Sequence, residues 1–133
     1  SLCDIKFHIA WTTKARDPIL TNGVGTRSRE LIREICAVHD ARIVSGLVAP
    51  DHIHIEVACP PTVAPGDLVS DLKERTLQTL MDEFPDLKQQ YWGHAIWSVG
   101  YLCVTSGGNA EEQLRQYLDA QQSAKDDVFQ VTS

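Results

Sequence analysis

Residues 42–58 read RIVSGLVAPDHIHIEVA, and this stretch decides the fold. The apolar run at 42–49 predicts a strand, Pro50-Asp51 predicts a turn, and the alternation at 52–58 predicts a second strand. Successive side chains of a strand point to opposite faces, so the aliphatic residues of 52–58 enter the core and the polar ones stay on the other face. The stretch therefore predicts a hairpin with one buried face and one free face.

Outside this hairpin, hydrophobic periodicity and turn residues predict the remaining elements. They are a strand at 5–11, a helix at about 25–39, a helix at about 65–84 that ends before Pro85, a strand within 95–104, and a helix from Asn109 with Glu112 in a capping-box-like position. The order β-α-β-β-α-β predicts an α+β, ferredoxin-like fold, a four-stranded antiparallel sheet with helices on one face, plus an extra C-terminal helix. We expect residues 1–133 to form one domain, with the core at 1–105 and the last helix at 109–125.

The composition is that of a single globular domain. The chain has 133 residues, 43% of them hydrophobic and 23% charged, which excludes a disordered tail. It contains no run of about 18 apolar residues and no basic-then-apolar leader, so we expect no membrane partner and a cytoplasmic location. Because the chain begins at Ser1 rather than Met, we expect the natural start to have been trimmed.

The charge distribution argues against a duplex-binding domain. The formal net charge is −6; residues 1–66 carry 7 basic and 7 acidic groups, while residues 67–133 carry 5 and 11. All of the negative excess therefore lies in the second half of the chain. The basic footprint typical of duplex nucleic-acid binding is absent.

The four cysteines are scattered and form no C-x-x-C pair. They are Cys3, Cys36, Cys59 and Cys103. Zinc knuckles and redox motifs need close pairs, so the spacing favours small buried thiols in a reducing compartment.

His52, His54 and Glu56 share one face of the predicted strand. Residues two apart on a strand lie about 6.5–7 Å apart along the chain. Two imidazoles held in this way can close on one divalent ion, with a carboxylate beyond them. The alternative is that all three are polar residues on a solvated sheet face, and the pattern alone leaves both interpretations open.

The predicted last helix carries a second candidate site. Its inward stripe consists of Leu114, Tyr117, Leu118 and Gln121. Tyr117 and Gln121 are neighbours at spacing i, i+4, about 5–6 Å apart at Cβ. A tyrosine beside two leucines usually packs its ring and bonds its hydroxyl nearby. A neutral amide in line with such a stripe needs a partner, and a metal ion could be that partner.

A His-hydrophobic-His strand followed by a Tyr-x-x-x-Gln helix resembles the single-tyrosine HUH transposases, the insertion-sequence-200-like family of small elements that move as single-stranded DNA. The resemblance covers nearly the whole chain. It is carried by the segments FHIAWTTK (7–14), REIC (33–36), PDHIH (50–54), LK (72–73), EFPDLK (83–88), YWG (91–93), IWS (96–98), GY (100–101) and YLDAQ (117–121).

The resemblance implies a cut that uses no water. Tyr117 would attack the scissile phosphate, keep the 5′-phosphate as a phosphotyrosine and release a 3′-hydroxyl. A free phenol has a pKa near 10 and needs help at neutral pH. A Mg²⁺ or Mn²⁺ ion held by His52, His54 and Gln121 would polarise the phosphate.

The family also implies the partners. They are single-stranded DNA with hairpin structure, from the ends of a mobile element, and a second copy of the chain. In such a homodimer the tyrosine helix, joined through Ser106-Gly107-Gly108-Asn109, could act in trans. The candidate DNA contacts are Lys14, Arg16, Lys73 and Arg75 for phosphates, and Trp92, Trp97 and Tyr101 for stacking on bases.

Three positions depart from the family pattern. Asp17 stands where a basic residue is usual, Glu56 where an apolar one is usual, and Glu74 where a small one is usual.

Three other functions stay open. They are a relative that binds structured single-stranded DNA or RNA without cutting it, an unrelated hydrolase using His52, His54 and Glu56 with activated water, and a dimeric module without chemistry.

Overall fold

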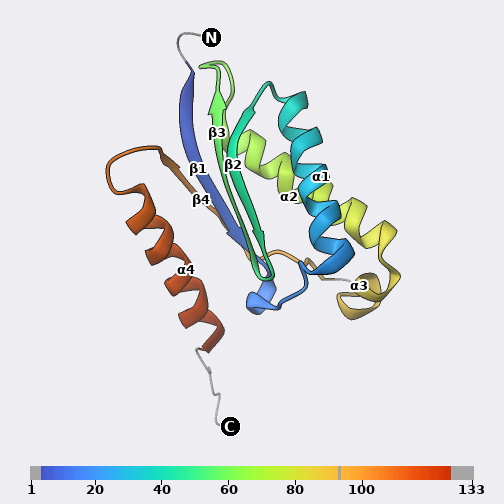
Figure 1. The fold of residues 1–133 in the computed structure, drawn as a ribbon. Coiled ribbons are helices and arrows are strands. Elements are labelled where there is room, and N and C mark those ends of the chain that lie inside the picture. Colours follow the sequence, from blue (N-terminus) through green and yellow to red (C-terminus); the bar gives the residue numbers. More distant parts are fainter. Residues whose placement is uncertain (1–3, 93, 127–133) are drawn as a thin grey trace.

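The computed structural model describes residues 4–92 and 94–126, with side chains up to position 122. Figure 1 shows the chain as one sheet with helices on both sides. The elements are β1 (Ile5–Thr12), a 3-10 turn η1 (Lys14–Arg16), α1 (Asn22–Val38), β2 (Arg42–Ala49), β3 (His52–Cys59), α2 (Pro65–Glu83), α3 (Pro85–Gln90), β4 (Leu102–Thr105) and α4 (Ala110–Asp126).

The sheet has the predicted topology. Its strand order is β2-β3-β1-β4, and all neighbouring strands are antiparallel. This order follows from two split β-α-β units, in which each helix carries the chain back across the sheet. The ferredoxin-like prediction is therefore confirmed.

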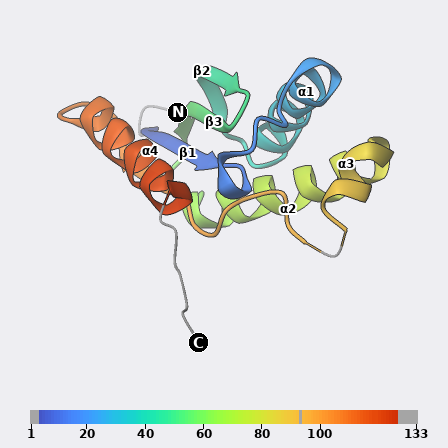
Figure 2. The same cartoon turned by 90° about the horizontal axis from the view of Figure 1, so that it is seen from below.

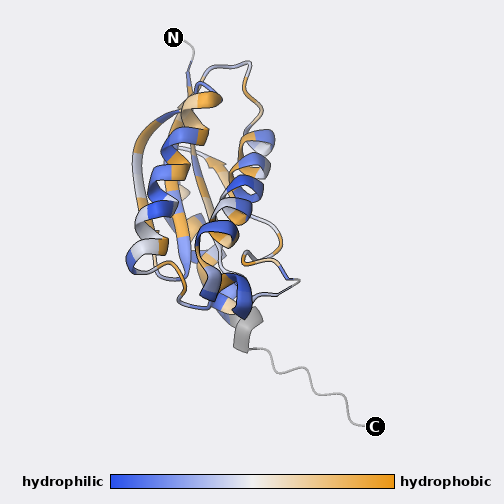
Figure 3. Ribbon diagram, turned by 90° about the vertical axis from the view of Figure 1, so that its right-hand side faces the viewer, coloured by the Kyte–Doolittle hydropathy of each residue, from blue (hydrophilic) through white to orange (hydrophobic). Residues whose placement is uncertain are grey.

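The core lies between the sheet and the pair α1 and α2. The aliphatic face of β3 supplies Ile53, Ile55 and Val57, which are 0–3% exposed. Figure 3 views the helical side and shows hydrophobic and hydrophilic residues alternating along α1 and α2, as expected of helices that bury one face. The alternation read from 52–58 therefore selects the face that is buried.

Helix α4 lies on the opposite face of the sheet. Figure 2 shows β1 between α4 on one side and α1 and α2 on the other. Helix α4 contacts β1, β4 and η1. Ala10 and Thr12, which point to this face of β1, are completely buried. The extra helix thus covers the β1 and β4 half of the sheet, next to β3, whose histidines emerge on the same face.

Residues 84–101 differ from the prediction. Pro85 ends α2 but also begins the short helix α3, because proline is well tolerated in a first helical turn. Only Leu102–Thr105 of the predicted strand pairs with β1. Gly100, with φ +88°, turns the chain before β4. Residues 96–98 instead form backbone hydrogen bonds with the end of β1 and the start of η1: Ser98 N donates to Thr12 O, and Lys14 N donates to Ile96 O.

The described cysteines fit the prediction of free thiols. Cys36 and Cys59 are buried and Cys103 is partly buried, all without a disulfide. Burial raises the pKa of Cys36 to about 12. Cys3 lies outside the described residues. Among the helices of the described part, none has the length and apolarity that crossing a bilayer requires.

The α2 side of the core yields a stability prediction. Leu72→Ala removes a fully buried side chain, so we expect the free energy of unfolding to fall by about 2–5 kcal/mol. Val99→Ala, at a position 98% exposed, should change it by less than about 0.5 kcal/mol. Urea denaturation followed by circular dichroism measures both. Equal effects would contradict the assignment of the core.

Candidate active site

The two histidines among the predicted metal ligands lie at the start of β3. His52 and His54 point away from the core, and both are partly buried. His52 Nδ1 lies 2.9 Å from Oδ1 of Asp51, the turn residue before it. A carboxylate on one ring nitrogen fixes the orientation of an imidazole and leaves its other nitrogen to bind a metal. Residue His52 is therefore held as metal-ligating histidines usually are.

Thr12 is the point where β3 and α4 meet. It lies opposite His52 in the antiparallel register of β1 and β3. Directly opposed side chains have Cβ atoms about 4.5–5.5 Å apart. From this buried position Thr12 Oγ1 donates a hydrogen bond of 3.2 Å to Gln121 Oε1. The fold therefore brings the amide predicted from the helix stripe beside the histidine predicted from the strand.

Tyr117 lies one helical turn before Gln121 on the same face of α4. Its hydroxyl is buried and has no hydrogen-bond partner within the described part of the chain. Burial raises the pKa of Tyr117 above its ordinary value, and the nearby Thr12 and Arg16 only partly offset this. The phenol therefore stays protonated at neutral pH, with Thr12 as a polar neighbour of its hydroxyl.

His8 is a site residue that the sequence analysis missed. Its Nδ1 lies 2.9 Å from His54 Nε2, and the two rings stack with centroids 5.2 Å apart. Burial lowers the pKa of His54, and the neighbouring His8 and His52 lower it further. Strand alternation places His8 opposite the core residues Phe7 and Ile9, but only the pairing of β1 with β3 brings it to His54.

Glu56 is engaged rather than free. Its Oε2 accepts a 2.6 Å hydrogen bond from Ser106 Oγ and lies 3.6 Å from His8 Nε2. The Ser106 hydrogen bond is the main cause that holds the pKa of Glu56 below its ordinary value. The side chains of His52, His54 and His8 form a histidine row on this face of the sheet. Glu56 is thus an ionised group at the His8 end of this row, and it is bound to Ser106 in the loop before α4.

The donor set fits a divalent ion of intermediate softness. Two imidazoles and an amide oxygen suit Mn²⁺ or Zn²⁺, and also Mg²⁺ when water completes the shell. In residues 4–92 and 94–126, no three or more His, Cys, Asp or Glu side chains are arranged to hold a metal together. An ion at His52 and His54 would therefore depend on Gln121 and solvent for its other ligands.

The comparison with known families identifies the family of this chain. The sequence profile described as "Transposase IS200 like" matches residues 1–121, which include every residue of the site. This chain belongs to the IS200-like transposase family.

Two curated relatives in this family span most of the chain. The ISDra2 transposase TnpA of Deinococcus radiodurans is 27% identical over 117 residues, covering 88% of this chain and 84% of the relative. The transposase for insertion sequence element IS200 of Salmonella typhimurium is 27% identical over 116 residues, covering 87% and 76%.

Two solved structures share the fold. A candidate transposase from Deinococcus radiodurans R1 superposes with a TM-score of 0.82 at 28% identity, over 89% of this chain and 91% of the other. The REP-associated tyrosine transposase bound to a REP hairpin superposes with a TM-score of 0.60 at 15% identity, over 86% and 62%. The second likeness concerns the fold alone.

The cations predicted to contact DNA have mostly internal partners in this IS200-like chain. Lys73 Nζ donates to the carbonyls of Ser98 and Gly100, both at 2.8 Å, and burial lowers its pKa. Arg75 lies 3.5 Å from Asp71. Lys14 is exposed and has no ion pair with a described residue. Among these three cations, Lys14 is the one that is free to bind a phosphate.

Of the two tryptophans predicted to stack on bases, one serves the fold. Trp97 is 5% exposed, packs edge-on against Trp11 with centroids 5.8 Å apart, and donates its Nε1 proton toward Lys73 O and Thr76 Oγ1. It is a core residue with no ring face open to a base, which corrects the expectation that it stacks on DNA. Trp92 is 74% exposed and remains a stacking candidate.

Two charged residues near the site are also bound internally. Arg16 is 12% exposed at its side chain and contacts Asp51 and the Leu118 carbonyl. Asp17, which departs from the family pattern, accepts a 2.5 Å hydrogen bond from the Tyr91 hydroxyl. The carboxylate of Asp17 is therefore tied to the fold.

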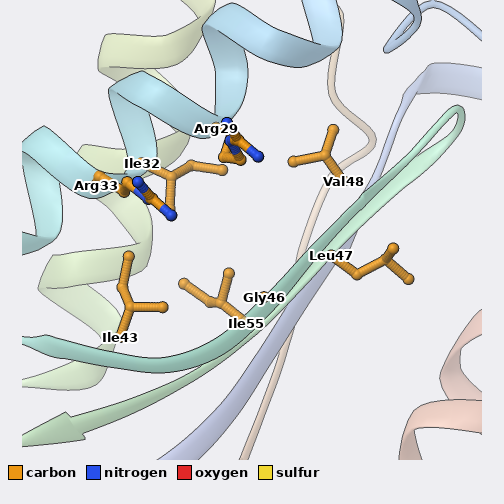
Figure 4. Close-up of a pocket in the computed structure, with 8 residues that line it drawn as sticks. All are labelled: Arg29, Ile32, Arg33, Ile43, Gly46, Leu47, Val48 and Ile55. Atoms are coloured by element: carbon orange, nitrogen blue, oxygen red, sulfur yellow. The ribbon is translucent and has the colours of Figure 1, made fainter.

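A groove of about 90 Å³ lies between α1 and β2, away from the candidate site. Figure 4 shows Arg29 and Arg33 of α1 over a floor that includes Ile43, Val48 and Ile55. It contains no residue of the histidine row or of α4. This apolar hollow is therefore separate from the candidate site at His52, Thr12 and Gln121.

The unpartnered hydroxyl gives a second stability prediction. Tyr117→Phe should leave the free energy of unfolding unchanged or raise it by up to about 1 kcal/mol, because a buried hydroxyl without a partner is costly. Tyr91→Phe, which breaks the bond to Asp17, should lower it by about 1.5–3 kcal/mol. Urea denaturation of both variants measures this. A larger loss for Tyr117→Phe than for Tyr91→Phe would contradict the geometry.

Proposed function

We propose that this transposase cleaves and rejoins single-stranded DNA through a covalent 5′-phosphotyrosine on Tyr117. In this proposal His52, His54 and Gln121 hold a Mg²⁺ or Mn²⁺ ion, and the substrate is a hairpin at the end of a mobile element. Membership of the IS200-like family supports the reaction class. The finer steps rest on the site itself.

One observation carries the proposal: Thr12 joins the two halves of the site. It faces His52 across the sheet and binds Gln121 on α4. Tyr117, one turn from Gln121, therefore projects toward the same end of the sheet as the histidines. A site of this kind needs a nucleophile and a charge stabiliser within reach of one phosphate.

The chemistry assigned to Tyr117 balances without water. Its oxygen forms a bond to phosphorus, the bond from phosphorus to the 3′-oxygen breaks, and the phenol proton is released as the 3′-hydroxyl gains one. The phosphodiester energy is conserved in the phosphotyrosine, so the reverse attack by a 3′-hydroxyl rejoins DNA. Burial keeps Tyr117 as a phenol until substrate arrives.

The residues around the nucleophile have defined tasks. His52 and His54 would hold the ion through ring nitrogens, and Asp51 orients His52. A divalent ion supplies charge that polarises the phosphate and stabilises the transition state. Since His8 Nδ1 contacts His54 Nε2, His8 has to release that nitrogen before His54 can use it as a ligand.

The DNA is expected to cross the sheet where β1 ends and β3 begins, next to His52 and Lys14. A tyrosine transposase of similar fold has been solved with a REP hairpin, which supports a hairpin substrate for this chain. Lys14 is the proposed phosphate contact, with Lys73 and Arg75 as weaker ones, and exposed Trp92 and Tyr101 are proposed to stack on bases. We further propose a homodimer in which α4 can complete the partner's site.

The adduct tests the reaction directly. With a labelled hairpin oligonucleotide and Mn²⁺, wild-type protein should form a species that survives denaturing electrophoresis. Tyr117→Phe should abolish this species while the Kd for the same oligonucleotide changes by less than about threefold, because only the attacking oxygen is lost.

The control is Tyr91→Phe, a buried tyrosine outside the site, which should still form the adduct. Wild-type protein that binds DNA but never forms an adduct would favour a non-cleaving relative. Cleavage that survives Tyr117→Phe but not Glu56→Gln would favour a hydrolase.

The salt dependence of binding tests the phosphate contacts. Each phosphate contact on a single strand contributes about 0.7 to the slope of log K against log salt. Lys14→Gln should lower this slope by about 0.7. Arg75→Gln should lower it by less than half of that, because Asp71 already neutralises Arg75. Fluorescence anisotropy over a KCl series measures both, and equal slopes for the two variants would contradict the assignment.

A further inference from the structure

Arg16 joins two parts of the chain that are far apart in sequence. Its Nε and Nη2 lie 3.0 and 2.9 Å from Asp51 Oδ2, and its Nη1 donates to the carbonyl of Leu118 at 2.8 Å. Its side chain is 12% exposed. One guanidinium thus connects the turn before β3 with the middle of α4.

The Leu118 contact reports the position of α4. Leu118 lies inside the helix, directly after Tyr117 and three residues before Gln121. A carbonyl has two lone pairs, so one in mid-helix can accept a second hydrogen bond beside its helical one. Displacing α4 along or away from the sheet breaks this bond together with the placement of both side chains.

The Asp51 contact extends to the histidine. Oδ2 of Asp51 takes the guanidinium and Oδ1 contacts His52 Nδ1 at 2.9 Å. The Asp51 backbone carbonyl is fixed separately by Thr13, whose N and Oγ1 lie 3.0 and 3.2 Å away. The carboxylate is therefore held between Arg16 and His52, and its rotation would move both contacts.

The backbone around Arg16 is an independent observation. Ala15 and Arg16 have φ of 55° and 54°, two consecutive non-glycine residues in the left-handed region. Such residues are uncommon and persist where surrounding contacts determine them. Here the strained turn directs the Arg16 side chain between Asp51 and α4.

We propose that Arg16 is a positioning residue that couples the docking of the tyrosine helix to the orientation of the His52 ring. The proposal rests on the proposed role of His52 as a metal ligand. Coupling is reciprocal, so an ion bound at His52 stabilises the docked helix, and the docked helix strengthens ion binding. The same contacts leave Arg16 little capacity to bind a DNA phosphate.

The metal-free protein provides the first test. Hydrogen exchange of the backbone amides in 110–122 should be several-fold faster in Arg16→Gln than in wild type. It should also be faster in Asp51→Asn, although Asp51 has no described contact with α4. Arg16→Lys, which keeps the charge but cannot span both partners, should lie between wild type and Arg16→Gln. Arg27→Gln, which breaks ion pairs with Glu30, Glu34 and Glu83 elsewhere, should leave this exchange unchanged.

The second test uses Mn²⁺ alone as the probe. Gln121→Ala removes the direct link between α4 and the ion, so any remaining effect must pass through Arg16. In this background Mn²⁺ should slow exchange in 110–122, and adding Arg16→Gln should abolish that effect. Calorimetry should show Mn²⁺ affinity falling further but by less than about 10-fold, because Asp51, the direct partner of His52, is still present and its loss would cost about 10- to 100-fold.

The outcomes distinguish the proposed coupling through Arg16 from the proposed metal dependence. Unchanged exchange in 110–122 for Asp51→Asn, or equal Mn²⁺ affinities with and without Arg16, would overturn the coupling. A lower slope of DNA binding against salt in Arg16→Gln, with Mn²⁺ affinity intact, would instead assign Arg16 to a phosphate. Failure of wild type to bind Mn²⁺ would overturn the proposed metal dependence. The hydrogen exchange of the metal-free protein would then decide by itself whether Arg16 and Asp51 hold α4 in place.

Discussion

The antiparallel register of β1 and β3 is the constraint on which the candidate site depends. It sets Thr12 opposite His52 and His8 opposite Glu56, so that one sheet face collects the polar side chains of both strands. A shift by one residue would send these groups into the core and the isoleucines to solvent. The burial of Ile9, Trp11, Ile53 and Ile55 therefore fixes the geometry of the candidate site as well as the fold. The polar side chains of the site thus lie on the sheet face opposite the hydrophobic core.

Helix α4 completes the site on a part of the sheet that the ferredoxin-like core leaves uncovered. Its docking relies on few specific contacts, chiefly Thr12 with Gln121 and Arg16 with Leu118. A helix attached by specific polar contacts can be released at modest cost, unlike one buried in a continuous apolar core. This balance suits the proposed role of α4, which is to carry a nucleophile and to admit DNA.

The site also contains features that oppose stability. The Tyr117 hydroxyl is buried without a described partner, and Ala15 and Arg16 adopt left-handed backbone conformations. Such features usually persist where they serve a function. The protein meanwhile uses several cations internally: Arg16 and Arg75 bind carboxylates, and Lys73 binds two carbonyls. An acidic family member therefore has few free cations for DNA in the regions where the family is expected to be basic.

The sequence by itself determined the buried face of β3 and the common faces of His52 with His54 and of Tyr117 with Gln121. These follow from periods of 2 and 3.6 residues, which are local properties of the chain. It did not predict His8 beside His54, the Arg16–Asp51–Leu118 contacts, the core position of Trp97 or the short β4. Each depends on which segments pair and on how a side chain competes for space and hydrogen bonds among residues distant in sequence. Local periodicity assigns a residue to a face of its own element, whereas tertiary packing alone decides what lies against that face.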